Sequence, residues 1–453
     1  MKRYRRRVIS TTHWILLSFL SAILVGSLLL SLPISAADGN AVPFVDAFFT
    51  ATSATCVTGL TTLPIVSTWS FFGQAVILLL IQIGGLGIIT VFAGVMVALR
   101  KTMGLHDRLL IQDAFNLNTM SGLSAFVKKV ILGSLAIEAI GALLCMIVFV
   151  PDYGARGIWI SVFHSVSAFC NAGMDVLSEN SLIAYAVNPL INTVTMLLIV
   201  LGGVGFIVWW DVLRVCKEFP KKKFRCLRHL TLHSKVALSM TVLLLVGGAI
   251  CFFCLERRNP LTMADASLGE RIWLSLFQSV TTRTAGFATL PQQDLTDASA
   301  LISLLLMFIG GSPVGTAGGI KTVTVTVLVA AAISAMKNRN EVTLYRRTLS
   351  AYAVRKAIAV TGMSFAILFV SAVLLTAVTD ASALDVLYET VSATATVGLS
   401  RNLTPFLNTA GKLIIILTMY LGRVGPISLA VALNLKKTNE NIIKAPIEEL
   451  SVG

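Results

Sequence analysis

The chain has 453 residues, of which 56% are hydrophobic and only 13% are charged, and its mean hydropathy is +0.84. A composition this apolar excludes an ordinary soluble domain and indicates an integral membrane protein. The formal net charge of +14 does not indicate nucleic-acid binding, because most of the 36 Lys and Arg residues fall in loops on one side of the predicted spans, and most acidic residues fall on the other. This asymmetry places the basic side and both termini in the cytoplasm.

In chain order, the apolar segments form four predicted repeats, each with a spanning helix, a short re-entrant helix, a loop and a second spanning helix. Repeat one (1–99) has helix 13–33, short helix 43–54, loop 55–60 and helix 71–99. Repeat two (100–215) has helix 125–150, short helix 157–169, loop 170–174 and helix 188–215. Repeat three (216–335) has helix 233–256, short helix 268–281, loop 282–287 and a broken helix over 298–335. Repeat four (336–435) has helix 355–378, short helix 383–394, loop 395–400 and helix 409–434, before a cytoplasmic tail over 436–453.

Two features argue for this division. The short helices have about 12 residues, whereas a helical span needs about 20. The basic N-terminus followed by an apolar stretch is similar to a signal peptide, but the apolar part is long and has no convincing cleavage site. We therefore expect a retained first helix. The predicted fold is an all-α membrane protein with eight transmembrane helices in a pseudo-fourfold arrangement around one central pore.

A common pattern marks the four short helices: an aromatic residue, small and hydroxyl residues, and then a glycine, which comes one residue sooner in the third copy. The pairs are Phe49 with Gly59, Phe163 with Gly173, Phe277 with Gly286, and Tyr388 with Gly398. A second mark follows each glycine, at Gly84-Gly85, Gly202-Gly203, Gly310-Gly311 and Gly422-Arg423. Fourfold repetition in an apolar chain predicts four like elements around one axis.

These loops are candidates for an ion-selective filter. The short helices enter from the acidic side, so their C-terminal ends point to the membrane centre, where their partial negative charge favours a cation. Non-helical backbone is tolerated there if it lines a water-filled path, and rings of backbone carbonyls can replace the hydration shell of K⁺. The candidate K⁺ ligands are the carbonyls of Thr55, Cys56, Val57, Thr58, Gly59, Cys170, Asn171, Ala172, Gly173, Arg283, Thr284, Ala285, Gly286, Ala395, Thr396, Val397 and Gly398. The alternatives are ordinary helix-ending glycines and hydroxyl residues that join neighbouring helices.

A glycine-rich stretch interrupts the second helix of repeat three. Its residues include Gly310, Gly311, Ser312, Pro313, Gly315, Thr316, Ala317, Gly318, Gly319 and Lys321. Glycines and a proline at this density cannot sustain a regular helix. We expect an irregular loop in the pore just below the filter, where it would gate conduction. The stretch fails as a phosphate-binding P-loop, because Ile320 separates Gly319 from Lys321 and no strand precedes it.

Three other polar residues lie in apolar segments. Arg423 replaces the second glycine of the fourth mark, and it either faces the pore and contacts the gating loop or snorkels to an interface. His164 occupies the slot of Thr50, Gln278 and Glu389 in the other short helices, where a hydrogen bond behind the filter is favoured over a ligand role. Glu138, inside a predicted span, is assigned no role.

The four filter loops and the 310–321 stretch are similar to those of the Ktr/Trk/HKT superfamily of potassium transporters, and Leu421-Gly422-Arg423 resembles its fourth-repeat arginine motif. The nearest resemblance is to the membrane subunit of bacterial Ktr systems. It implies a K⁺-conducting homodimer in the bacterial plasma membrane, with one pore per subunit and a cytoplasmic ring of nucleotide-binding regulatory subunits. It also implies K⁺ selectivity, because position 59 is glycine; Na⁺ as an activator stays open. Membrane lipids are expected partners and no organic cofactor is expected.

Two other classes of function would each require polar groups in particular places. A secondary carrier for another solute would favour titratable groups at the midplane, and beyond Arg423 and Glu138 there are almost none. A membrane-embedded enzyme would need paired acids, histidines or a nucleophile facing the cytoplasm, and the sequence shows no such constellation. Cys251 and Cys254 form a C-x-x-C pattern, but it lies inside an apolar helix without a partner pair.

Overall fold

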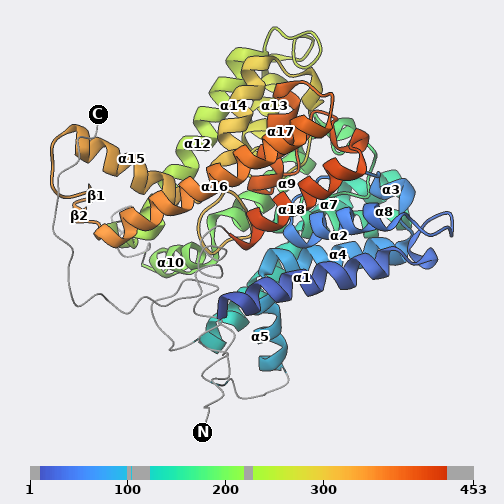
Figure 1. Ribbon diagram of the computed structural model, residues 1–453, viewed down its shortest axis with the longest axis horizontal. Coiled ribbons are helices and arrows are strands. Elements are labelled where there is room, and N and C mark those ends of the chain that lie inside the picture. The colour runs from blue at the N-terminus through green and yellow to red at the C-terminus, as the bar shows by residue number, and fades with distance from the viewer. Residues whose placement is uncertain (1–10, 99–103, 105–122, 219–227, 426–453) are drawn as a thin grey trace.

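The computed structural model of the protein describes residues 11–98, 104, 123–218 and 228–425, and it is almost entirely helical (Figure 1). Four described helices are long and apolar enough to cross a membrane, and each opens one of the predicted repeats. They are α1 (Thr11–Leu30), α7 (Leu123–Tyr153), α12 (Leu232–Glu256) and α16 (Ala351–Val378). The chain therefore has the fold of an all-α membrane protein.

The second helix of each repeat is shorter or interrupted. The segments are α4 (Phe71–Leu86) with α5 (Ile88–Ala98), α9 (Pro189–Val204) with α10 (Phe206–Cys216), α14 (Asp297–Phe308) with α15 (Thr322–Met336), and α18 (Thr409–Val424). Counting each bent pair as one span gives up to six candidate spans in the described chain, compared with the eight expected. The end of the expected 409–434 helix and the 436–453 tail lie outside the described residues.

Two of these helices differ from the straight helices expected over 71–99 and 188–215. The chain bends by 96° between α4 and α5 and by 100° between α9 and α10. The residues at the bends, Gly87 and Gly205, have φ values of 85° and 96°. Such a conformation is open to glycine but interrupts a right-handed helix. Gly425 has a φ of 88° at the equivalent position, directly after α18.

The short helices are α2 (Phe44–Cys56), α8 (Ala155–Cys170), α13 (Leu268–Thr281) and α17 (Ala383–Ala395). Each packs against the long helix that precedes it. Ser267 and Ser382 cap the first turns of α13 and α17, and acidic residues in those turns suit the positive end of the helix dipole. Thr55, Cys56, Cys170 and Ala395 belong to the last helical turns, so the irregular backbone begins slightly later than predicted for loops one, two and four.

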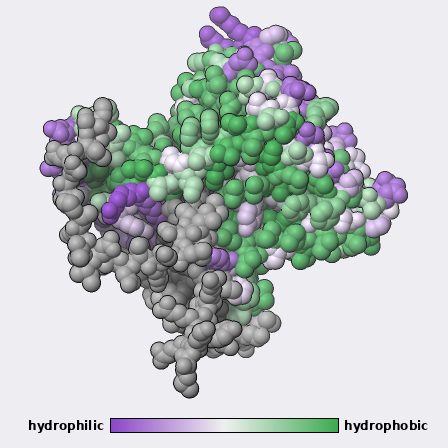
Figure 2. Space-filling model, in the orientation of Figure 1, coloured by the Kyte–Doolittle hydropathy of each residue, from purple (hydrophilic) through white to green (hydrophobic). Residues whose placement is uncertain are grey.

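The surface and the interior divide as expected for a protein in lipid. The C-terminal halves of the short helices are almost completely buried, whereas the long helices expose large apolar side chains such as Leu143 and Leu243. Apolar residues cover most of the flank shown in Figure 2, and hydrophilic residues gather toward its margins. A hairpin of β1 (Thr343–Leu344) and β2 (Arg347–Thr348) pairs Thr343 with Thr348 and follows α15 at the end of the bundle away from α3 (Ile65–Thr68), as Figure 1 shows.

Candidate ion-conduction site

The four loops after the short helices share one backbone conformation. Two residues before each glycine lies a non-glycine residue in the left-handed region: Val57 (φ 55°), Asn171 (φ 60°), Thr284 (φ 63°) and Thr396 (φ 50°). The glycines themselves have φ values of 97° (Gly59), 65° (Gly173), 81° (Gly286) and 97° (Gly398). Alternation between left-handed and ordinary residues turns successive carbonyls in similar directions, as a carbonyl-lined site requires. Left-handed non-glycine residues are strained, and such strain gathers at functional sites.

The last hydroxyl of the repeated pattern closes each loop. Ser53 Oγ accepts a hydrogen bond from the Gly59 amide at 3.1 Å, and Ser392 Oγ accepts one from the Gly398 amide at 3.0 Å. In repeat two, Ser167 Oγ accepts from the Met174 amide at 3.1 Å. The sequence pattern identified these hydroxyl positions without indicating what they bind.

Loop three is closed differently because it is one residue shorter. In loops one, two and four an amide bonds to the carbonyl five residues earlier, at 2.8 Å, as in a Schellman motif. In loop three the Ala285 amide bonds to the Thr281 carbonyl, four residues earlier, at 3.0 Å. The Thr281 hydroxyl donates to the Phe287 carbonyl at 2.5 Å. The Thr284 and Gly286 conformations are nevertheless kept, so the missing residue shortens the turn and preserves the end of the loop.

The four glycines meet in a closed ring. A Cβ atom on each glycine would overlap the carbonyl oxygen of the residue before the next loop's glycine. The pairs run in cyclic order: Gly59 with Ala172, Gly173 with Ala285, Gly286 with Val397, and Gly398 with Thr58. Four segments far apart in sequence therefore place their backbones around one point, and no side chain larger than hydrogen fits there. The alternative of four unrelated helix-ending glycines does not account for this cyclic contact.

Outside the ring lies a vestibule of about 250 Å³, lined in part by all four glycines. Its lining among the described residues includes the carboxylates Asp175 and Glu179 and no Lys or Arg side chain. Burial raises the pKa of Asp175 to about 6, against hydrogen bonds from Ser178, Ser181 and Leu177 that lower it. A vestibule of this sign attracts cations to the ring.

The glycines of the second repeated pattern, which lie in the helices that follow the loops, allow close packing below the ring. A Cβ atom on Gly84 would meet the Thr55 carbonyl, and one on Gly422 would meet the Thr394 carbonyl. Gly202 stands in the same relation to the Phe169 carbonyl. Three spanning helices thus lie directly against the C-terminal ends of the short helices in their own repeats.

Repeat three departs from this arrangement, and its glycine-rich stretch occupies the space. Gly310 faces the Gly318 carbonyl instead of a short helix. The stretch is non-helical between α14 and α15, and the Gly310 amide bonds to the Ile320 carbonyl at 3.0 Å to close its base. Its middle bonds to repeat two, where the Ser312 amide donates to the Gly203 carbonyl at 2.8 Å.

Contacts with the candidate filter loops place this stretch against the inner side of the ring. Thr316 Oγ1 donates to the Phe169 carbonyl and to Asn171 Oδ1, both at 3.1 Å. The Gly318 amide donates to Thr284 Oγ1 at 3.2 Å, and a Cβ on Gly318 would overlap Thr396 Oγ1. The stretch therefore touches loops two, three and four. The sequence located the break, but it gave no sign of these partners.

Two cationic side chains hold the same stretch. Arg423 of α18 donates to the Thr316 carbonyl at 2.7 Å and to the Gly84 carbonyl at 2.5 Å. Lys321 Nζ donates to the Ala317 carbonyl at 2.6 Å. Arg423 therefore contacts the glycine-rich stretch within the protein and does not extend to an interface. Gly311, Pro313, Gly315 and Gly319 complete the loop between these contacts.

Other buried polar groups pack behind the loops. The Arg283 guanidinium donates to the Gly310 carbonyl at 3.2 Å and to the Thr241 carbonyl at 3.4 Å. Both carboxylate oxygens of Glu138 accept from Gln82 Nε2 at 3.1 Å, and the Cys170 thiol lies 3.9 Å from Glu138 Oε1. His164 Nε2 lies 2.8 Å from Thr195 Oγ1, so the imidazole forms a hydrogen bond to α9.

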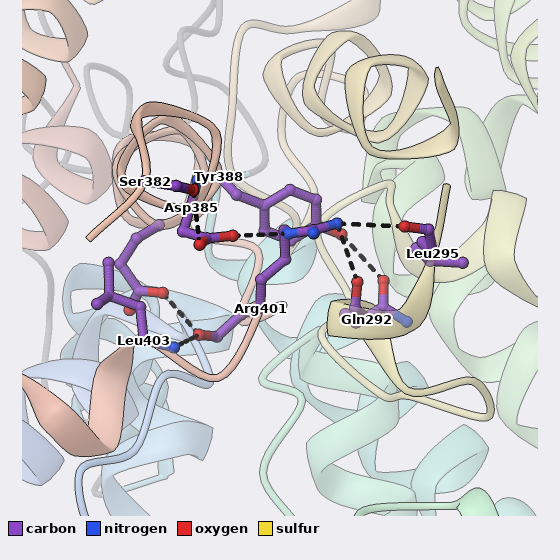
Figure 3. Close-up of polar contacts among 9 residues, drawn as sticks. Gln292, Leu295, Ser382, Asp385, Tyr388, Arg401 and Leu403 are labelled. Atoms are coloured by element: carbon purple, nitrogen blue, oxygen red, sulfur yellow. Dashed lines mark hydrogen bonds and ion pairs between the residues drawn. The ribbon is translucent and has the colours of Figure 1, made fainter. Parts of the chain in front are cut away.

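Figure 3 shows a further polar cluster on the outer side, where Arg401 reaches from the fourth loop to Asp385 and to the segment around Gln292. Glu389, at the position equivalent to His164, accepts from the Ser400 hydroxyl at 2.7 Å. Tyr388 donates to Gln292 Oε1 at 2.9 Å and so joins repeat four to repeat three. The sequence singled out none of these outer contacts.

Comparison with known proteins agrees with this geometry. Residues 8–444 match the family described as "TrkH: Cation transport protein". The chain is 38% identical over 460 residues to the potassium/sodium uptake protein NtpJ of Enterococcus hirae, covering 100% of this chain and 99% of that protein. It is 39% identical to the Ktr system potassium uptake protein B of Bacillus subtilis, covering 96% of this chain and 95% of that protein.

The Ktr system potassium uptake protein B of Vibrio alginolyticus is 36% identical, covering 97% of this chain and 94% of that protein. In fold, the chain is similar to the crystal structure of the potassium transporter TrkH from Vibrio parahaemolyticus. The TM-score is 0.75 at 18% identity, covering 95% of this chain and 86% of that one. The chain belongs to the TrkH family of cation transport proteins, within the Ktr/Trk superfamily.

Proposed function

We propose that the chain is the ion-translocating subunit of a K⁺ uptake system in the bacterial plasma membrane. The observation that carries this proposal is the ring of four glycines, in which each loop contacts the next in cyclic order. K⁺ is the transported ion and binds the backbone carbonyls of the four loops. The related Ktr proteins are named potassium uptake proteins, which supports this choice of ion.

The glycine-rich stretch is the proposed gate. It lies against the inner side of the ring and is fastened by Arg423 and by its contacts with Phe169 and Asn171. In this position the stretch and its two cations obstruct the exit from the filter. Flux then requires its displacement, which we assign to a cytoplasmic ring of nucleotide-binding regulatory subunits acting on a homodimer of this chain.

The membrane potential supplies the driving force. A potential of 100 mV is worth ~2.3 kcal/mol per elementary charge, which corresponds to about 50-fold accumulation of K⁺. No chemical fuel is then needed by this subunit. The rival reading, a carrier with alternating access, would require a binding site enclosed at the midplane and titratable coupling groups. The four loops instead open directly onto the outer vestibule.

The test is ion flux into liposomes that contain the chain purified together with its regulatory subunits, so that the proposed gate can open. Flux is measured under an imposed membrane potential and after the potential is collapsed. Because one relative is named for both potassium and sodium, Na⁺ is the paired cation. The proposal predicts K⁺ flux well above Na⁺ flux and its loss when the potential is collapsed. Comparable K⁺ uptake without a potential contradicts it, and so does equal flux of the two ions.

A further inference from the structure

Arg401 occupies an unusual place beside the outer vestibule. It follows the ring glycine Gly398 by three residues, and its neighbours Ser400 and Asn402 both line the cavity. Arg401 itself is not among the described lining residues. A long cationic side chain in this loop could reach the cation path, yet the structure keeps it out.

One strong contact and two weaker ones hold the guanidinium (Figure 3). Arg401 Nε donates to Asp385 Oδ1 at 2.8 Å, which is the length of a charge-assisted hydrogen bond. Its NH1 group lies 3.4 Å from the Gln292 carbonyl and 3.5 Å from the Leu295 carbonyl, at the outer limit for hydrogen bonding. The Arg401 side chain is 12% exposed and that of Asp385 is 30% exposed. Asp385 therefore supplies the main restraint.

Asp385 is itself fixed in position by the first turn of α17. The Ser382 hydroxyl donates to Asp385 Oδ2 at 2.7 Å, and the Asp385 amide donates to Ser382 Oγ at 3.2 Å. One carboxylate oxygen is thus held by the helix cap, and the other is directed at Arg401. Asp385 thus belongs to the first turn of α17, the short helix that leads into the fourth candidate filter loop.

We propose that Asp385 is a positioning residue that keeps the Arg401 cation out of the vestibule and so preserves its negative potential. The inference rests on the proposed K⁺ conduction, because a cation released beside the ring would repel the ion that enters. The lining carboxylates Asp175 and Glu179 would then face a charge of opposite sign within the same cavity. Focused fields in a cleft change the local concentration of an ion by about tenfold or more.

The primary test measures the vestibule potential without relying on conduction. Gln293 lines the vestibule and is exposed, so Gln293→Cys provides a reporter thiol. Impermeant methanethiosulfonates carrying a trimethylammonium or a sulfonate group are applied from outside, and the ratio of their reaction rates is followed by mass spectrometry of the reporter peptide. The chain without the reporter gives the background from its own cysteines.

The expected result depends on both partners of the pair. Asp385→Asn should lower the cationic-to-anionic rate ratio about tenfold, and adding Arg401→Gln should restore it to near the parent value. Asp385→Glu is the matched control that keeps the charge. An unchanged cationic-to-anionic rate ratio in Asp385→Asn overturns the proposal. A lowered ratio that Arg401→Gln does not restore also overturns it, because the pair would then only stabilise the local structure.

K⁺ flux in the same variants separates this inference from the proposed function. At low ionic strength, Asp385→Asn should reduce K⁺ entry several-fold, and the double variant should recover it; high salt should narrow the difference. These fluxes are measured with the regulatory subunits present; absence of K⁺ flux in the parent complex counts against the proposed function, while the thiol ratios still decide the role of Asp385. Thermal unfolding of each variant shows whether it is folded.

Discussion

The hydrogen bond between Arg423 and the glycine-rich stretch allows a quantitative prediction about the gate. Arg423 donates to the Thr316 carbonyl at 2.7 Å, within a partly buried site. Hydrogen bonds to charged groups contribute about 1.5–3 kcal/mol. Arg423→Gln removes the charge and shortens the side chain, so the closed arrangement should lose that amount. Since 1.4 kcal/mol is a factor of ten, the open fraction should rise about ten- to 150-fold while it remains small.

The assay is K⁺ entry into liposomes that contain the chain without its partner subunits, where the gate is expected to be closed. Arg423→Lys is the matched control, because it keeps the cation but lacks the forked donor that reaches both Thr316 and Gly84. Its flux should lie between those of the parent and Arg423→Gln. If Arg423→Gln folds normally and its K⁺ flux equals or falls below that of the parent, Arg423 does not stabilise the closed position of the glycine-rich stretch.

Four further predictions follow from the same geometry. Gly59→Ser should lower the K⁺ over Na⁺ flux ratio, because φ is 97° and a Cβ would overlap the Ala172 carbonyl; Gly39→Ser, with a φ of 74° and open space, should leave the ratio unchanged. Deletion within Gly311–Gly318 should raise K⁺ flux, and a folded deletion variant that conducts no faster would count against a gate. Gly422→Ala should lower the unfolding temperature, because its Cβ would meet the Thr394 carbonyl at a cost of about 1–3 kcal/mol. The control is Gly362→Ala, whose Cβ would meet nothing within 4 Å. Equal unfolding temperatures of the two variants would contradict this prediction. Lowering the outer pH below about 6 should reduce K⁺ flux as the Asp175 carboxylate is protonated and its charge is lost from the vestibule, and a profile that persists unchanged in Asp175→Asn would exclude Asp175 as the cause.

The repetition of one pattern made the site predictable from sequence. Four aromatic-to-glycine segments located the loops, and the density of glycine around Pro313 located the break in the third repeat. These features are local, since each depends on backbone freedom and helix propensity within a few residues. The repeated positions then indicated that the loops would meet.

What the sequence did not reveal depends on contacts between distant segments. A glycine within an apolar run does not show the sign of its φ, so the bends at Gly87 and Gly205 were not expected. Likewise, nothing in the sequence near Gly84 indicates that the Thr55 carbonyl lies against this glycine. Nor does it indicate that Arg423 donates a hydrogen bond to the Gly84 carbonyl. The pairing of Arg401 with Asp385 joins a loop to the start of the preceding helix and became visible only in three dimensions.

The central claim is that the four glycines surround a cation site, and the most direct measurement is to locate a bound ion. Thallium(I), a heavy analogue of K⁺, can be introduced in place of K⁺ and located by its anomalous scattering in crystals of the protein. The account predicts thallium at the centre of the ring formed by Gly59, Gly173, Gly286 and Gly398. Excess K⁺ should displace this thallium, and Na⁺ at the same concentration should not. Thallium bound elsewhere, with none at the ring, would contradict it.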